Sequence, residues 1–229
     1  MRVLSIDTSC GAASAAVFDA ASRQALARLS EPMAHGHAEA LGPIVESVLR
    51  DSEGGVASIG AIAVTVGPGS FTGIRIGLAM ARAIGLTLEV PVIGVSTLVA
   101  FAAPLLEEPR QGVVVAAIDA KHGGVYVQAF ESSGRPLFAP RVASLRDAIR
   151  AIGAGPARMA GDGAEALALE GRRAGLVCDA SGAAAYPDIV AVARIALASN
   201  PAECPPNPLY LKPPDARPAT GDAIARADG

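Results

Sequence analysis

The sequence predicts an α/β protein built from two mixed β-sheets with flanking helices, the second unit a duplicate of the first. An internal repeat aligns Ile6-Asp7 with Ile118-Asp119, an offset of 112 residues that needs no gap. Each copy has the pattern of an apolar strand that ends in Asp, a glycine turn and a second apolar strand. Strand and helix patterns alternate after both copies, as they do in a sheet covered by helices.

In the first unit, the hairpin over residues 3–19 precedes an alternation of strands and helices. We expect strands over 24–29, 61–66 and 92–95, and helices over 37–51, 71–88 and from Thr97 onward. The first unit therefore has the order βββαβαβα. A sheet with both antiparallel and parallel strands follows from this order, because the hairpin strands are antiparallel and the crossovers through helices are parallel.

The second unit starts with the hairpin over 115–131 and largely repeats this order. We expect strands over 137–142, 158–160 and 176–178, and helices after Ser144, after Gly163 and over 187–199. Ser144 is a suitable N-cap, and Asp147 is an acid in the first turn, where it favours the helix dipole.

The repeat also divides the chain into domains. We place the first lobe at residues 1–107, the second at 108–218 and a loose tail at 219–229. Seven prolines after Asn200 prevent a further helix. Leu209-Tyr210-Leu211 is expected to be a short anchored segment within this proline-rich region.

Composition excludes several classes of protein. Apolar residues make up 51% of the chain and charged residues 18%, which is typical of a packed globular protein and not of a disordered one. Aromatic residues make up only 3%, so platforms for base stacking are scarce. The net charge is −3 and the only lysines are Lys121 and Lys212, which argues against an autonomous nucleic-acid-binding protein.

The sequence predicts no disulfide, signal peptide or membrane helix. Cys10, Cys178 and Cys204 form no C-x-x-C pair, so we expect free thiols in a reducing cytosol. Asp7 interrupts the start of the chain before the apolar region of a signal peptide is complete. The apolar stretch without charge at 90–106 is shorter than a membrane helix, so we expect no membrane span.

The most distinctive string is Gly67-Pro68-Gly69-Ser70-Phe71-Thr72-Gly73-Ile74-Arg75, which joins a strand to a helix. It lacks the Gly-Lys-Ser/Thr ending of a phosphate loop and the G-x-S-x-G pattern of a nucleophile elbow. Two interpretations stay open. The string is a tight turn in which Ser70 caps the helix, or the helix N-terminus faces an anionic group.

The helix that follows carries a stripe of small residues at every fourth position, Gly73, Gly77, Ala81 and Gly85. Such a stripe lies on one face and allows another element to approach closely. The preceding helix has an apolar face at Leu41, Ile44, Val45, Val48 and Leu49. We expect one helix face to pack on the sheet, and consider the small-residue face as a contact between subunits.

Few residues suggest catalysis. Asp7 and Asp119 end equivalent strands, so they either face a cleft between lobes, near metal and phosphates, or cap their own glycine turns. His35 and His37 are two residues apart, which is not the i, i+4 spacing of a metal pair on a helix. His37 is a candidate interface or capping residue.

Six motifs together resemble the TsaB (YeaZ) family, and they span most of the chain. They are Ile6-Asp7-Thr8-Ser9, His37 at a helix start, the string from Thr65 to Arg75, Asp119-Ala120-Lys121-His122-Gly123-Gly124-Val125-Tyr126, Gly161-Asp162-Gly163 and Pro208-Leu209-Tyr210-Leu211. The resemblance implies a two-lobed fold of the actin, sugar-kinase and Hsp70 type, which is ribonuclease H-like in each lobe.

The resemblance also implies a function. Members of this family are non-catalytic partners of TsaD, the paralogue that transfers a threonylcarbamoyl group to a tRNA adenosine with the help of the ATPase TsaE. We therefore expect a cytoplasmic protein that forms a heterodimer with a TsaD-like paralogue and a homodimer when alone. It would contact tRNA only through the complex. No cofactor is expected on this chain, while the paralogue would bind metal and the complex ATP.

The family's partner surface is built from the two helices of the first unit. By this resemblance, the expected partner-interface residues are His37, Leu41, Ile44, Val45, Val48, Phe71, Gly73, Ile74, Gly77, Leu78, Ala81 and Gly85. The expected residues near the cleft are Asp7, Thr8, Ser9 and Asp119.

The sequence itself supports a non-catalytic chain. Where the catalytic paralogue has an H-x-x-x-H metal motif, this chain reads Ser96-Thr97-Leu98-Val99-Ala100-Phe101, which offers no such ligand pair. The older peptidase label for this superfamily lacks a metal or a triad here. The alternative is a small ATP-binding enzyme, a kinase or ATPase, that uses the cleft between the lobes.

Overall fold

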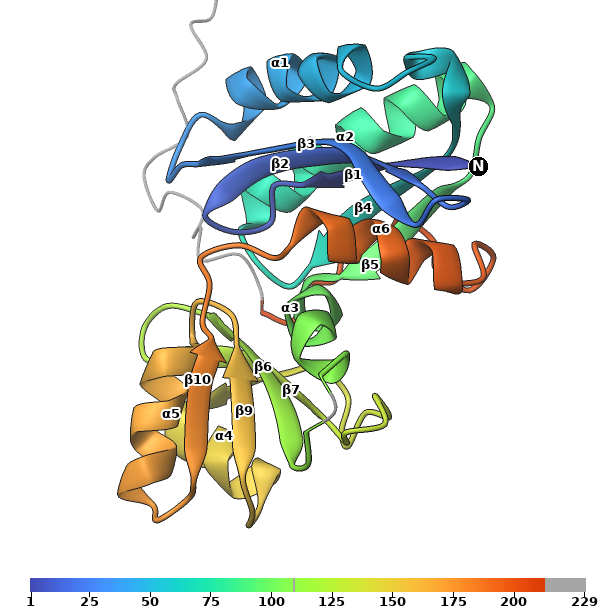
Figure 1. Cartoon of the computed structure of the whole chain (residues 1–229). Coiled ribbons are helices and arrows are strands. Elements are labelled where there is room, and N and C mark those ends of the chain that lie inside the picture. The colour runs from blue at the N-terminus through green and yellow to red at the C-terminus, as the bar shows by residue number, and fades with distance from the viewer. Residues whose placement is uncertain (109, 213–229) are drawn as a thin grey trace, which may run out of the picture.

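Two five-stranded mixed sheets form the two lobes of the molecule (Figure 1). The structure is a computed structural model that describes residues 1–108 and 110–212. The first sheet has the order β3-β2-β1-β4-β5 and the second β10-β9-β6-β7-β8. Both sheets therefore place their first strand at the centre, with the hairpin on one side and two parallel strands on the other, so the predicted duplication and two-lobed fold are confirmed.

The first sheet follows the prediction closely. Its strands are β1 (Arg2–Asp7), β2 (Ala12–Asp19), β3 (Gln24–Pro32), β4 (Ile59–Gly67) and β5 (Val92–Ser96). Its helical elements are α1 (His37–Arg50), the short η1 (Val56–Ser58), α2 (Phe71–Leu88) and α3 (Thr97–Leu106). The apolar faces of α1 and α2 pack on one side of this sheet.

The second sheet agrees in order but differs in two strands. Its strands are β6 (Val113–Asp119), β7 (Gly124–Phe130), β8 (Arg141–Ser144), β9 (Ala157–Ala160) and β10 (Cys178–Gly182). Its helices are α4 (Leu145–Ile152), α5 (Ala164–Arg173) and α6 (Ile189–Ala198). Ser144 caps α4 by accepting from the backbone N–H of Asp147, as predicted.

The predicted strands over 137–142 and 176–178 are misplaced. Residues 136–140 begin and end with proline, which has no N–H for a ladder, so β8 starts only at Arg141. The N–H of Leu176 instead closes the end of α5 on the Gly171 carbonyl, which delays β10. In both cases a local backbone constraint outweighed an apolar run.

The two lobes exchange helices, which contradicts the predicted domain boundaries. α6 lies after the second sheet in the chain but packs on the free face of the first sheet, against β1 and β2. α3 precedes the second sheet in the chain and packs on the face of that sheet formed by β6 and β9. In Figure 1 these helices lie at the junction of the lobes. A boundary after residue 107 therefore cuts across both cores.

The segment after α6 also returns to the first lobe. The N–H of Leu209 donates to the Val66 carbonyl at 2.7 Å, and the N–H of Gly94 donates to the Cys204 carbonyl at 2.8 Å. The predicted anchoring of residues 209–211 is thus confirmed for Leu209. The predicted loose tail, 219–229, lies outside the described residues.

Two consecutive acids at the end of α3 join the lobes by ion pairs. Glu107 pairs with Arg194 of α6 at 3.2 Å, and Glu108 pairs with Arg158 of β9 at 3.2 Å. The Arg158 side chain is only 6% exposed, and its Nε and Nη2 have no hydrogen-bond partner in the described part of the chain. Glu108 is therefore the group that compensates a buried positive charge.

We expect Glu108→Ala to lower the free energy of unfolding by about 1–2 kcal/mol, because it leaves Arg158 buried without its carboxylate. The matched control Glu107→Ala breaks a more exposed pair and should cost less than about 1 kcal/mol. Urea unfolding followed by circular dichroism measures both. Equal losses in the two variants would contradict a special role for the buried pair.

Candidate functional site

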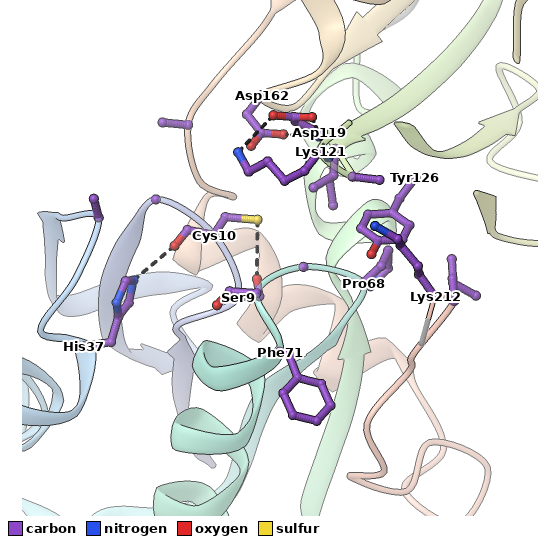
Figure 2. Close-up of a pocket in the computed structure, with 18 of the residues that line it drawn as sticks. Ser9, Cys10, His37, Pro68, Phe71, Asp119, Lys121, Tyr126, Asp162 and Lys212 are labelled. Atoms are coloured by element: carbon purple, nitrogen blue, oxygen red, sulfur yellow. Dashed lines mark hydrogen bonds and ion pairs between the residues drawn. The ribbon is translucent and has the colours of Figure 1, made fainter. Parts of the chain in front are cut away.

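A cavity of about 580 Å³ lies between the two lobes (Figure 2). The turn between β1 and β2, the loop before α1, the N-terminus of α2, the end of β6 and the C-terminal segment surround it. Its polar and aromatic lining comprises Ser9, Cys10, His35, His37, Ser70, Phe71, Asp119, Lys121, Tyr126, Asp162, Tyr210 and Lys212. Both lobes contribute residues to the cavity. The exchange of α3 and α6, which joins the lobes, therefore also sets the distance between the two walls of the cavity.

Rare residue types gather in this cavity. It is lined by both lysines of the chain, two of its three histidines and three of its eight phenylalanine and tyrosine residues. The sequence alone does not point to these residues as one site. Its members come from separate segments, and only the fold brings Lys121 and Lys212 to one place. Their scarcity elsewhere in the chain was the signal that could have found them.

Asp7 does not face the cavity, which corrects the prediction for this residue. Its side chain is fully buried, and Oδ1 accepts hydrogen bonds from the Ser9 N–H at 3.0 Å, the Ser9 hydroxyl at 2.6 Å and the Thr65 hydroxyl at 2.5 Å. Oδ2 has no partner among the described residues. Burial raises the pKa of Asp7, although the Ser9 and Thr65 hydrogen bonds act against this shift.

Thr8 is also buried and away from the cavity, which corrects a second prediction. Its hydroxyl donates to the Gly73 carbonyl at 2.7 Å, so it fastens α2 to the end of β1. Of the four residues predicted near the cleft, Ser9 borders the cavity although it is inaccessible to solvent, and Asp119 is exposed to it. Asp7 and Asp119 each accept from a backbone N–H of their own turn, that of Ser9 and that of Lys121, which agrees with the capping alternative.

The glycines of the string at 67–75 explain why Asp7 is covered. A Cβ on Gly69 would clash with the Ser9 carbonyl oxygen, and one on Gly73 would clash with the Thr8 carbonyl oxygen. The N–H of Ser70 donates to the Ser9 carbonyl at 2.8 Å, and its hydroxyl caps α2 by accepting from Gly73. The interpretation of this string as a tight turn with an N-cap is confirmed.

A charged cluster forms the second-lobe side of the cavity. The Lys121 Nζ lies 2.9 Å from Asp119 Oδ2, and Asp162 Oδ1 accepts from the Asp119 N–H at 2.9 Å. Burial acts to raise the pKa of Asp119, but the hydrogen bonds and charge of Lys121 outweigh it, so this pKa is lowered. Partial desolvation in the cleft raises the pKa of Asp162. Figure 2 shows Lys121 pointing between these two carboxylates.

The backbone that presents this lysine is strained. Lys121 and His122 have φ values of 60° and 54°, a left-handed conformation that is uncommon for residues other than glycine. Such conformations persist where the surrounding structure requires them, and they gather at functional sites. The left-handed turn at Lys121 and His122 therefore indicates that the position of the Lys121 side chain in the cavity wall matters for function.

The Cys10 thiol is poorly suited to act as a nucleophile. Burial, together with the negative charges of Asp7 and Asp162, raises its pKa well above the usual value, so it stays protonated at neutral pH. His37 is bound to the Cys10 carbonyl oxygen through Nε2 at 3.1 Å. Among the described residues, no group of three or more His, Cys, Asp or Glu side chains could hold a metal ion.

The predicted partner-interface residues are mostly internal, which is the largest correction. His37 and Phe71 are partly exposed. The other ten lie in the buried interior of the first lobe: Leu41, Ile44, Val45, Val48, Gly73, Ile74, Gly77, Leu78, Ala81 and Gly85. The small-residue stripe approaches strands of its own lobe, because a Cβ on Gly77 would meet the Thr8 hydroxyl and one on Gly85 would clash with Val92. The stripe therefore does not face a partner.

The other side of α2 is largely exposed in the described part of the chain, where residues 206–210 contact it at Phe71, Arg75 and Arg82. α2 is the one helix in the described part of the chain that is long and apolar enough to cross a membrane by length and composition, yet only 33% of it is buried. Its exposed residues are Thr72, Arg75, Ala79, Arg82, Ala83, Leu86 and Thr87. Leu86 is 83% exposed, the highest value among the large apolar side chains of residues 1–108 and 110–212.

The burial of Asp7 predicts a pH dependence. Because the folded-state pKa lies above the ordinary value of 3.8, the folded state holds a proton that the unfolded state releases, and stability falls as pH rises through this interval. Asp7→Asn keeps an acceptor for Ser9 and Thr65 without the charge. It should raise the free energy of unfolding at pH 7 and flatten the decline above pH 3.8.

Asp19 supplies a control of opposite sign. Hydrogen bonds from Ser22 lower the pKa of this exposed carboxylate, so its stabilising effect is present above the unfolded pKa and is lost as pH falls. Asp19→Asn should therefore lower stability at neutral pH. Urea unfolding over a pH series measures both variants, and a stability loss at pH 7 in Asp7→Asn would overturn the prediction.

Known proteins resemble this chain in sequence and in structure. The family model described as TsaD, tRNA N6-adenosine threonylcarbamoyltransferase, matches residues 30–185. The tRNA threonylcarbamoyladenosine biosynthesis protein TsaB of Escherichia coli (strain K12) is 39% identical over 55% of this chain and 53% of its own length, so the chain spans about half of that relative. An uncharacterized protein of Mycobacterium tuberculosis is 33% identical over 94% of each chain.

A solved structure covers nearly the whole fold. YeaZ from Pseudomonas aeruginosa superposes with a TM-score of 0.71 at 25% sequence identity, over 92% of this chain and 99% of that one. A second structure from this organism, described as similar to the peptidase YEAZ, gives a TM-score of 0.73 with the same coverage. Coverage of 92% of this chain means that these similarities extend across both lobes.

Proposed function

Because the chain belongs to the TsaB (YeaZ) branch of the TsaD family, we propose that it is a non-catalytic partner of a TsaD-like paralogue in the formation of threonylcarbamoyladenosine on tRNA. The TsaB relatives are named for this biosynthesis. A supporting role fits a cleft in which the acid at the end of β1 is buried and the thiol is kept protonated.

The exposed side of α2 is the observation that carries this proposal. A helix of this apolar character, with only a third of its length buried, exposes apolar area that another protein would cover. The exposed apolar residues Ala79, Ala83 and Leu86 lie three or four positions apart, so they share one face. Arg75 and Arg82 border this face and bind the C-terminal segment, Arg75 through the Tyr210 hydroxyl and Arg82 through the Pro206 carbonyl.

The remaining parts of the assembly follow from this role. We propose that a TsaE-like ATPase joins the complex, that tRNA is reached through the complex, and that the same α2 face pairs two copies when the paralogue is absent. Such a complex works where tRNA is modified, in the cytoplasm. The paralogue would supply the metal and the complex the ATP, so this chain needs no cofactor of its own for a partner role.

Leu86→Glu tests the docking surface. Since Leu86 is 83% exposed, the substitution should change the free energy of unfolding by less than about 0.5 kcal/mol. A buried carboxylate at the centre of an interface should weaken association with the paralogue by roughly a hundredfold or more. Co-purification of tagged full-length chains, followed by titration calorimetry, measures the association.

Two further variants complete this test. Val177→Glu changes an apolar residue that is 73% exposed near β10, far from α2 in the chain, and should leave association intact. Gly77→Arg should lower the free energy of unfolding by about 3 kcal/mol or more, because Thr8 and Val64 leave no space for a side chain. Normal association in Leu86→Glu would refute the proposed surface.

A further inference from the structure

The cavity between the lobes lies at the N-terminal end of α2, whereas Leu86 of the proposed docking face lies near its C-terminal end. We propose that this cavity receives an unpaired nucleotide from a single-stranded segment of RNA, a proposal that rests on the tRNA-modifying role proposed above. A nucleotide presents a flat base and an anionic phosphate, so its recognition needs stackable rings and cations. The cavity holds both kinds of group, and each kind comes from both sides of the junction between the lobes.

Aromatic rings lie on two sides of the cavity. Tyr210 lines it on the first-lobe side, where its ring packs on Phe71 with centroids 4.9 Å apart and Arg75 covers the Phe71 ring, and Tyr126 of β7 lines it from the second lobe. A chain with 3% aromatic residues has few rings to place, so three in one cavity is a concentration. Stacking on such rings tolerates every base, because each base has a π-face.

Positive groups accompany the rings. Both lysines of the chain line the cavity, and Figure 2 shows Lys212 beside Tyr126 on one wall and Lys121 on the wall opposite Ser9. The Arg75 guanidinium lies 3.7 Å from the centre of the Phe71 ring, which adds charge at the rim. The N-terminus of α2, an 18-residue helix, opens on the cavity at Ser70 and contributes a positive end of its dipole.

The carboxylates of the cavity favour RNA over a free nucleotide with a magnesium ion. A magnesium–nucleotide complex is held through carboxylates, and of the two that line the cavity Asp119 is paired with Lys121 and Asp162 accepts from the Asp119 N–H. An RNA segment needs no metal held by the protein, and the rest of the RNA can be bound by the partner. The net charge of −3 then explains why this chain alone would bind RNA weakly.

The test uses the full chain in complex with its TsaD-like paralogue and a fluorescein-labelled RNA hairpin with a single-stranded loop. Tyr126→Leu should weaken binding, measured by fluorescence anisotropy at low salt, roughly tenfold. Tyr186→Leu is the matched control, because Tyr186 is the remaining tyrosine and is not among the cavity residues. Lys121→Met should reduce both the affinity and its salt dependence.

A second measurement keeps the proposal independent of the folding of any variant. A hairpin with 4-thiouridine in its loop should cross-link to this chain at peptides containing Phe71, Tyr126 or Tyr210. Cross-links confined to the paralogue, or equal affinity in Tyr126→Leu and the wild-type complex, would overturn the proposal. So would equal binding of a blunt RNA duplex, or displacement of the hairpin by AMP at equal concentration, which would indicate a site for a free nucleotide.

Failure of the partner role is distinguishable from failure of this inference. Tyr126 lies on β7, outside α1 and α2, so Tyr126→Leu should co-purify with the paralogue as the wild type does. If no complex forms with the wild-type chain, the partner role fails. Cross-linking of the isolated chain at low salt then still decides whether the cavity binds single-stranded RNA.

Discussion

The backbone of the first turn of α2 lies directly on the turn that follows β1, and the rest of the molecule depends on this contact. Gly69 and Gly73 face the carbonyl oxygens of Ser9 and Thr8 without room for a Cβ. The contact is sealed by hydrogen bonds from the Ser70 N–H and the Thr8 hydroxyl. It buries Asp7 beneath the helix, fixes which side of α2 faces the sheet and places the N-terminus of α2 at the cavity.

The exchange of α3 and α6 between lobes complements this contact. Each sheet is covered on one face by helices of its own unit and on the other by a helix from the far side of the junction. Consecutive acids at the end of α3 then bind one arginine in each lobe. Relative movement of the lobes would expose apolar area in both cores, so the cavity is held in one shape.

The sequence predicted the order of elements and the duplication because both arise from local patterns. α2 was predicted over the residues it occupies, since Ser70 caps it and Leu88 ends its apolar pattern. The exchange of helices was not predictable, because an apolar helix such as α6 carries no mark of which sheet it covers. The site was predicted least well: Ser9 and Asp119 border the cavity, but Lys121, Tyr126 and Lys212 meet only through tertiary structure.

The small-residue stripe shows why a pattern alone misleads about surfaces. Small residues at every fourth position indicate close approach, and the structure satisfies this indication within the lobe, where Gly77 meets Thr8 and Gly85 meets Val92. The burial of that face leaves the opposite face of the same helix, with Leu86, for solvent or a partner. The glycines therefore affect docking indirectly. Because they allow only one side of α2 to lie close to the sheet, they determine which apolar residues of α2 remain exposed.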